Sequence, residues 1–183
     1  MATTDNSLDR VYKYLNNLIG QKCWSVIAGS GTGSMVSLAF GEKFRSIHKS
    51  RNNALTKEQQ EYDGEFKIFI QQARWNLSVN DKVICTDQDT NETNGIMLSS
   101  LKQIVDKQVN YIQLISHTGS FKVIFANNFS LNVYCEDFVD DFDDNYSLFD
   151  KNNILTVGNM CQILVEPCER FKMDNVEQSH WSA

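Results

Sequence analysis

The sequence predicts an α+β fold dominated by antiparallel β-sheet, with two tandem units that pack into one sheet, a sandwich or a barrel-like body. Three observations lead to this prediction. The first segment has the apolar spacing of a helix, and most later apolar segments alternate or form short runs, as strands do. In addition, the order of these segments is similar in both halves of the chain. A three-stranded unit with one apolar face needs a second such face to bury it.

The first half begins with a helix and continues with strands. In SLDRVYKYLNNLIG (residues 7–20) the apolar residues recur at helical spacing, Asp5 or Ser7 can cap the start, and Gly20 follows the end. Residues 45–64 are polar and begin basic, so we interpret them as a surface excursion with a helical turn near 55–62. Apolar alternation predicts strands at residues 23–28, 35–40, 65–70 and 74–77.

The second half follows the same order. Residues 86–95 form a polar loop, and residues 96–105 (IMLSSLKQIV) carry apolar positions at helical spacing. Further strands are predicted at residues 109–115, 120–125, 130–135, 146–149 and 160–166.

Matching anchor residues indicate an internal repeat. Leu15 and Leu18 match Leu98 and Leu101, and each unit closes with an aromatic-x-Leu segment at Trp75 or Tyr146. The alternation also agrees in phase, because Val36, Leu38 and Phe40 match Phe121, Val123 and Phe125. We therefore expect one domain over 1–183, built of two pseudo-repeats (about 8–80 and 95–150) plus a C-terminal strand and tail.

Composition argues against several classes of protein. The formal net charge of −6 and the pI near 5.0 argue against sequence-independent nucleic-acid binding, which needs a basic surface. The longest apolar runs are far shorter than the roughly 20 residues of a membrane span, and the polar start is unlike a signal peptide. The five cysteines include no C-x-x-C pair. We expect a cytoplasmic protein with reduced thiols and no membrane association.

The stretch AGSGTGSMVSLAFG (residues 28–41) raises the question of a phosphate-binding loop. A Walker loop needs a lysine after its last glycine, and a dinucleotide loop needs a helix there. Here the chain continues as an alternating strand, so the glycines are predicted to form a hairpin turn, in which they supply positive φ angles. A candidate contact loop remains at Gly29, Ser30, Gly31, Thr32 and Gly33.

An acidic segment in the second half is the main candidate for partner binding. Six carboxylates within nine residues would steer and dock a basic protein, and Phe138 and Phe142 between them could act as apolar anchors for a partner or for the core. An EF-hand is disfavoured because Tyr146 and Asn152 replace its turn glycine and bidentate glutamate. A solvated loop is the plain alternative. The acidic residues are Glu136, Asp137, Asp140, Asp141, Asp143 and Asp144.

The remaining polar residues suggest no cofactor, metal or catalytic site. The three histidines, His48, His117 and His180, lack metal-ligand spacing, and no serine nucleophile elbow occurs. Asp87 and Asp89 are interpreted as part of a surface turn and a helix cap. A Cys–His catalytic pair would have to be brought together by the fold.

The L-x-x-L-x-G start, the LAFG strand and the W-x-L closure, followed by a second similar half, resemble a group of uncharacterised bacterial proteins of two β-rich halves. The resemblance covers residues 8–150, and it departs at 45–64 and at Tyr146, where a second tryptophan is expected. It implies a small non-catalytic immunity protein that neutralises a bacterial toxin. The alternatives are an enzyme or nucleotide-binding protein using Gly29–Gly33, or a structural subunit of a larger assembly. The oligomeric state is left open.

Overall fold

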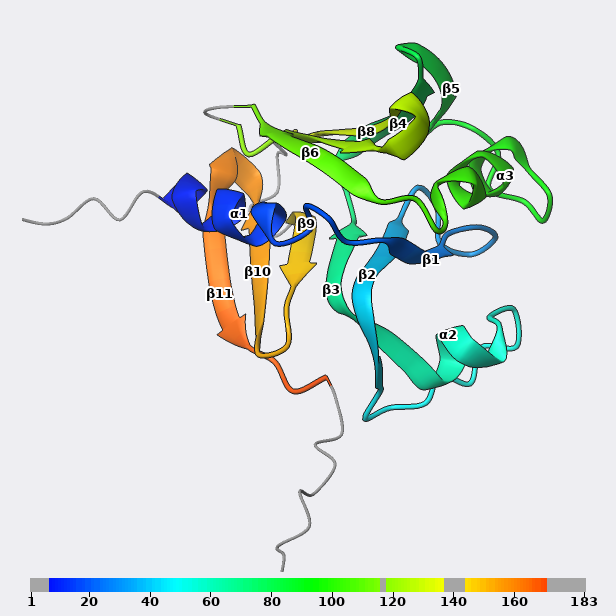
Figure 1. Ribbon diagram of the computed structural model, residues 1–183, viewed down its shortest axis with the longest axis horizontal. Helices are drawn as coiled ribbons and strands as arrows, with labels where there is room; N and C mark the ends of the chain where they lie inside the picture. The colour runs from blue at the N-terminus through cyan, green and yellow to red at the C-terminus, as the bar shows by residue number, and fades with distance from the viewer. Residues whose placement is uncertain (1–6, 116–117, 137–143, 171–183) are drawn as a thin grey trace, which may run out of the picture.

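The computed structural model describes residues 7–115, 118–136 and 144–170, and in these ranges the strands form two antiparallel sheets (Figure 1). The first sheet has the order β1-β2-β3-β9-β10-β11, and the second has the order β5-β4-β8-β7-β6. The strands of the first sheet are β1 (Cys23–Ile27), β2 (Val36–Arg45), β3 (Tyr62–Ile70), β9 (Asp144–Phe149), β10 (Asn153–Gly158) and β11 (Ile163–Pro167). Those of the second are β4 (Arg74–Val79), β5 (Lys82–Thr86), β6 (Val109–Leu114), β7 (Phe121–Phe125) and β8 (Phe129–Tyr134).

The predicted dominance of antiparallel β-structure is confirmed, while a barrel is not formed. The two sheets remain separate and share one hydrophobic core. On β2, Val36, Leu38 and Phe40 are fully buried, which is the face that their alternation predicted. The rings of Phe40 and Phe125 stack between the sheets, with centroids 6.4 Å apart and planes at 13°.

Each closing strand crosses to the sheet of the other half of the chain. β4 follows β3 after three residues but pairs with β8, so that Trp75 lies opposite Val133. β9 follows β8 in the chain but pairs with β3, which sets Tyr146 opposite Ile70. The hairpins β4–β5 and β9–β10 therefore extend the sheets formed by the other half. The sequence did not indicate this exchange. Each sheet therefore contains strands from both halves of the chain.

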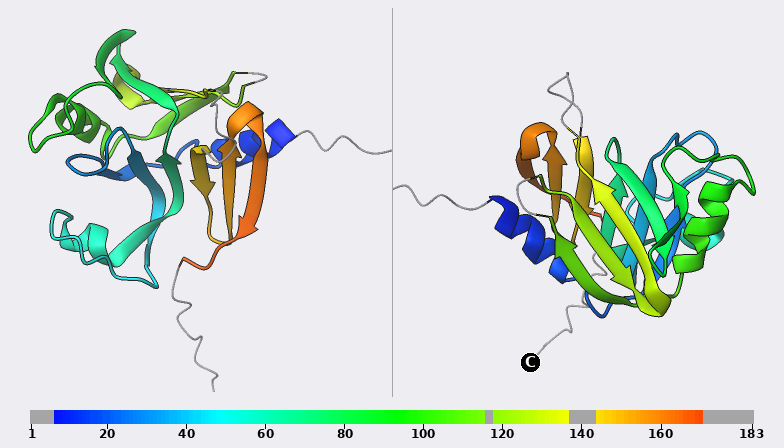
Figure 2. Two further views of the ribbon diagram at one scale, coloured as in Figure 1. Left: turned by 180° about the vertical axis from the view of Figure 1, so that it is seen from behind. Right: turned by 90° about the horizontal axis from the view of Figure 1, so that it is seen from above.

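Two helices, α1 and α3, lie on opposite sides of the molecule (Figures 1 and 2). The helix α1 (Ser7–Asn16) contacts β6 and β9, and α3 (Ile96–Leu101) contacts β5 and continues into the 3₁₀ turn η1 (Lys102–Ile104). Both pack apolar residues at helical spacing into the shared core. These residues are Val11, Leu15 and Leu18 in the first segment and Met97, Leu101 and Ile104 in the second.

Three short elements complete the fold, namely α2 (Lys57–Glu61), η2 (Ala126–Asn128) and η3 (Asn159–Cys161). α2 confirms the helical turn predicted inside the polar excursion. No helix in the described ranges combines the length and the apolar character that a membrane crossing requires.

Candidate functional site

The glycine stretch forms a hairpin loop between β1 and β2, as predicted. Gly29, Gly31 and Gly33 have φ angles of 125°, 87° and 61°, a region that other residues rarely adopt. The Thr32 hydroxyl donates to the Gly29 carbonyl at 2.7 Å and accepts from its N–H at 3.1 Å. Because β2 follows directly, the loop leads into no helix N-terminus that could bind phosphate.

The loop is held from outside by two side chains. Asn91 Nδ2 donates to the Gly33 carbonyl at 2.9 Å, and Trp75 Nε1 donates to the Ser34 carbonyl at 2.8 Å. Ser30, Gly31 and Gly33 are exposed, and a Cβ on Gly31 or Gly33 would have open space around it. The glycines there serve backbone conformation rather than close packing, and the contact role of the loop stays a prediction.

Of the predicted acidic site, the structure describes Glu136 and Asp144, whereas Asp137, Asp140, Asp141 and Asp143 lie outside the described residues. The two described ends are tied together by Asn145, which is 0% exposed. Its Oδ1 accepts from the Glu136 N–H at 2.8 Å, and its Nδ2 donates to the carbonyls of Glu136 at 3.1 Å and Gly158 at 3.2 Å.

The second end of the acidic segment is also fixed by the connection between β3 and β4. The backbone N–H of Gln72 donates to the Asp144 carbonyl, and those of Gln71 and Ala73 donate to the Asn145 carbonyl. In the described part of the chain, no hydrogen bond joins these residues to the glycine loop. The two predicted sites nevertheless lie at the same end of the first sheet, because Val36 is opposite Ile70 and Ile70 is opposite Tyr146.

The second acidic loop is structural, and its interpretation is wrong in two respects, the exposure of Asp87 and the helix cap. Asp87 is buried and pairs with Arg74 at 2.6 Å, so it is not a surface residue. Asp89 accepts from the Thr86 N–H at 2.7 Å and thus closes its own turn. The helix cap is instead Gly95, which makes no side-chain hydrogen bond at the start of α3.

Histidine and cysteine form no cluster where the structure describes them. His48 is exposed in the polar excursion, while His117 and His180 lie outside the described ranges. The five cysteines form no disulfide bond with one another. Burial raises the pKa of Cys23 to about 12 and that of Cys85 to about 11, so both remain protonated at neutral pH. No group of three or more histidine, cysteine or acidic side chains is gathered there that could hold a metal ion.

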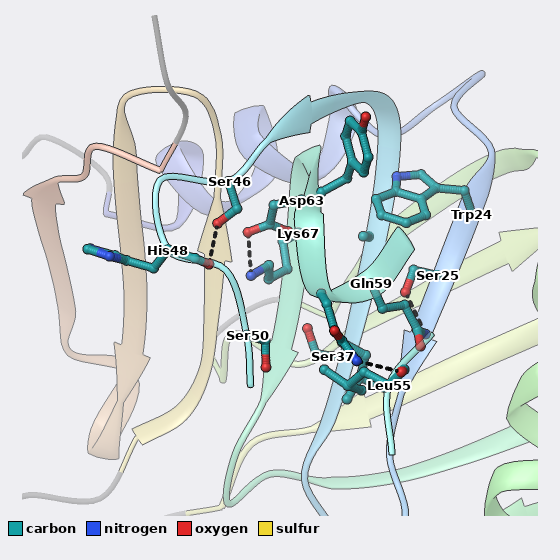
Figure 3. A pocket seen from close by; sticks show the side chains of 14 residues that line it. Trp24, Ser25, Ser37, Ser46, His48, Ser50, Leu55, Gln59, Asp63 and Lys67 are labelled. Atoms are coloured by element: carbon teal, nitrogen blue, oxygen red, sulfur yellow. Dashed lines mark hydrogen bonds and ion pairs between the residues drawn. The ribbon is translucent and has the colours of Figure 1, made fainter. Parts of the chain in front are cut away.

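A cavity that the sequence did not predict lies between α2 and the outer face of β1, β2 and β3 (Figure 3). It has a volume of about 250 Å³. α2 is positioned by a capping box, in which the Thr56 and Gln59 side chains each bond the other residue's backbone N–H. Gln59 Nε2 then reaches β1, donating to Ser25 Oγ at 3.0 Å and to the Val26 carbonyl at 3.1 Å.

One wall of this cavity carries a charged group of three residues. Lys67 Nζ lies 2.7 Å from Asp63 Oδ2, and Arg170 Nη1 lies 3.6 Å from the same oxygen. Both cations also lie over the Phe149 ring, at 5.2 and 5.3 Å from its centroid. Arg170 further donates to the Gly64 and Glu65 carbonyls, at 2.7 and 3.1 Å. Of these three residues, Asp63 and Lys67 line the cavity, and Arg170 supports Asp63 from behind.

The T-x-x-Q pattern at residues 56–59 is the signal in the sequence that could have indicated a fixed helix above the sheet. The small residues Ser37 and Ala39 on the outer face of β2 are the second signal, because they leave space there.

Comparison of the chain with models of protein families, with curated proteins and with solved structures gives no match.

Proposed function

We propose that this chain is a non-catalytic binding protein that engages a basic protein partner through its acidic segment, in the manner of an immunity protein. The observation that carries the proposal is the hydrogen bonding of the buried Asn145 to Glu136. It holds together the two ends of a stretch in which the sequence places six carboxylates in nine residues. A concentrated negative charge at a fixed place on the fold is what steers a basic partner.

Two further observations support this proposal. The cysteines form no disulfide bond with one another, as in a reducing compartment, which supports a cytosolic site of action. The resemblance to immunity-like proteins suggests a toxin as the partner, and many toxins that act on nucleic acids have basic surfaces. An acidic segment would cover such a surface by charge complementarity.

The test compares two sets of substitutions that each remove four negative charges. The first changes Asp140, Asp141, Asp143 and Asp144 to Asn. The matched control changes the exposed Asp9, Glu42, Asp81 and Glu166 to Asn or Gln. The partner is sought by co-expression with the products of neighbouring genes, and association rates are measured at low and high salt. We expect the first set to slow association by about tenfold at low salt and the control set to have a much smaller effect. Equal effects, or binding by no neighbouring product, would contradict the proposal.

We also propose that the two halves of the chain are copies of one repeat, related by an approximate two-fold axis. The main support is a reciprocal set of backbone hydrogen bonds between the segments before β1 and β6. Gly20 N–H donates to the Val109 carbonyl at 2.8 Å, and Asp106 N–H donates to the Cys23 carbonyl at 2.6 Å. Gly20 and Asp106 both have positive φ angles, 85° and 65°. These pairs favour matching Leu15 and Leu18 with Leu101 and Ile104, one helical turn beyond the match seen in the sequence.

The closing aromatics support the same equivalence. Trp75 donates to the carbonyl of Ser34, two residues before β2 begins, and Tyr146 donates at 2.7 Å to the carbonyl of Gly119, two residues before β7 begins. Both rings are essentially fully buried. The β1–β2 and β6–β7 pairs also share a register shift, at Cys23/Ser25 and at Val109/Tyr111. Tyrosine can thus take the place of tryptophan because its hydroxyl makes the corresponding bond.

A further inference from the structure

The cavity beneath α2 is preformed, because both its floor and its roof are fixed. Its floor is Ser37 and Ala39 on the outer face of β2. Ala39 is only 6% exposed although its side chain points away from the core, so it is covered from outside. The roof is α2, whose Gln59 is held by its bonds to β1 and to Thr56. A ligand would find this space without a rearrangement of the strands.

The lining of the cavity has an excess of hydrogen-bond donors. Within the described residues, the buried indole N–H of Trp24 has no hydrogen-bond partner. The hydroxyl of Ser37 makes no side-chain hydrogen bond there, and neither does that of Tyr62. Among the described residues, Lys67 Nζ pairs with Asp63 and lies over the Phe149 ring, so one of its three ammonium hydrogens is used in the ion pair. In contrast, both oxygens of Asp63 are engaged, by the Gly64 N–H and by the two cations.

The segment beside the cavity is rich in basic residues, although Glu58 and Glu61 of α2 pair with Lys43 and Lys49. Residues 43–57 contain five Lys or Arg side chains and no carboxylate. Two of these five, Lys49 and Arg51, line an open hollow together with His48, and this hollow shares His48, Ser50 and Gln60 with the cavity. Lys49 is paired with Glu61 at 2.6 Å, while Arg51 is exposed at the rim. The exposed Arg51 and the ammonium of Lys67 are thus the cationic groups that an anion entering by this opening would meet.

We infer that the cavity beneath α2 binds a small organic anion, a polar ring-sized molecule that carries one phosphate or carboxylate group. Its charged group is bound by Lys67 together with the Ser37 hydroxyl (Figure 3), and its body contacts Trp24 and Tyr62, which also line the cavity. The volume of about 250 Å³ lies below the usual range for drug-sized ligands, which limits the ligand to about one ring. This site is independent of the acidic segment and of the proposed protein partner.

The test is a titration of isotopically labelled protein, followed by the backbone amide NMR signals. The probes are inorganic phosphate, ribose 5-phosphate, glucuronate and the neutral sugar ribose, so that phosphate, carboxylate and uncharged ring are compared. We expect saturable shifts at residues 24–27, 37–39 and 59–63 with at least one anionic probe and none with ribose. The phosphate and carboxylate probes distinguish the two kinds of anion.

Three variants separate this site from general charge attraction. Lys67→Met should weaken binding by about tenfold or more, since hydrogen bonds to a charged group are lost. Ser37→Leu should abolish binding by filling the cavity. Lys151→Met is the matched control, because Lys151 also pairs with a carboxylate (Glu65, 3.3 Å) and lies over an aromatic ring (Phe44, 4.6 Å) but does not line the cavity.

Thermal unfolding establishes that each variant is folded. The inference is overturned if no anionic probe gives saturable shifts at millimolar concentration. It is equally overturned if Lys67→Met binds as the unchanged protein does, or if Lys151→Met weakens binding as much as Lys67→Met.

Discussion

Asn145→Ala should destabilise the protein substantially, although it removes only one short polar side chain. The amide makes three hydrogen bonds, to the N–H and the carbonyl of Glu136 and to the carbonyl of Gly158, and Asn145 itself is 0% exposed. Each bond contributes roughly 1 kcal/mol, and alanine leaves its partners unpaired in a part-buried setting. We therefore expect a loss of about 3 kcal/mol in the free energy of unfolding.

The assay is urea unfolding together with a thermal melt. For a chain of this size, 3 kcal/mol corresponds to a decrease in Tm of roughly 6–12 °C. The variant Asn145→Asp separates hydrogen bonding from packing, because it keeps the size of the side chain and one acceptor. At neutral pH its carboxylate would face the carbonyls of Glu136 and Gly158 without a proton to donate. It should therefore be at least as destabilising as alanine.

Lowering the pH should partly restore Asn145→Asp. Burial raises the folded-state pKa of such a carboxyl above the unfolded value of about 4, so its penalty is fully present well above both values and shrinks as the pH falls and the group is protonated. Asn110→Ala, at an exposed position on β6, is the control and should change stability by less than about 0.5 kcal/mol. If Asn145→Ala changed stability no more than this control does, the proposed fixing of the acidic segment would be refuted.

Three further predictions concern other parts of the molecule. Burial and the charge of Asp150 raise the pKa of Tyr14 to about 12, so its contribution to stability is present below pH 10 and lost as the pH rises toward 12; Tyr14→Phe should flatten that part of a stability–pH curve. Trp75→Phe and Tyr146→Phe should each cost about 1–3 kcal/mol in chemical unfolding, because each leaves a loop carbonyl without its donor; a large cost for one and none for the other would contradict their equivalence. Gln59→Ala should speed amide hydrogen exchange at residues 57–61 with little effect on Tm, since α2 buries no residue.

Much of the fold could be predicted because apolar periodicity reports which face of a segment is buried. Leu15 and Phe40 are both fully buried on the faces that their spacing indicated. The hairpin character of the glycine loop was also predictable, since β2 continues the alternation directly after Gly33. These are local properties, in which a residue's neighbours in the chain determine its environment.

The missed strands β5 and β10 were short and followed turns that the sequence analysis did not use. Asn80 and Asp81 both have positive φ angles, 50° and 61°, which is the backbone of a type I′ hairpin turn. This Asn-Asp pair could have indicated β5. The exchange of the closing strands could not be predicted, because β4 and β9 have the same pattern whether they pair within their own half or with the other half.

The cavity could not be predicted from the sequence, for a different reason. Its donors, such as Trp24 and Lys67, are brought to one face by the pairing of β1, β2 and β3, and α2 then covers them; nothing in their spacing reports these contacts. The pattern around residues 43–57 showed a positive charge, and the structure adds the enclosed space to which that charge leads.

Under the proposed repeat, the two halves differ most at the two places where we propose binding. Between the second and third strands, the first half inserts residues 46–61, which carry α2 and the cavity roof, where the second half has only η2. Between the third and closing strands, the second half inserts the acidic segment, where the first half has the three residues 71–73. Long insertions at such connections cost little in loop-closure entropy, so a stable core of two sheets tolerates them. The helices, strands and closing aromatics that correspond between the halves then account for folding. The two insertions without a counterpart are where we propose that each half binds its own ligand or partner.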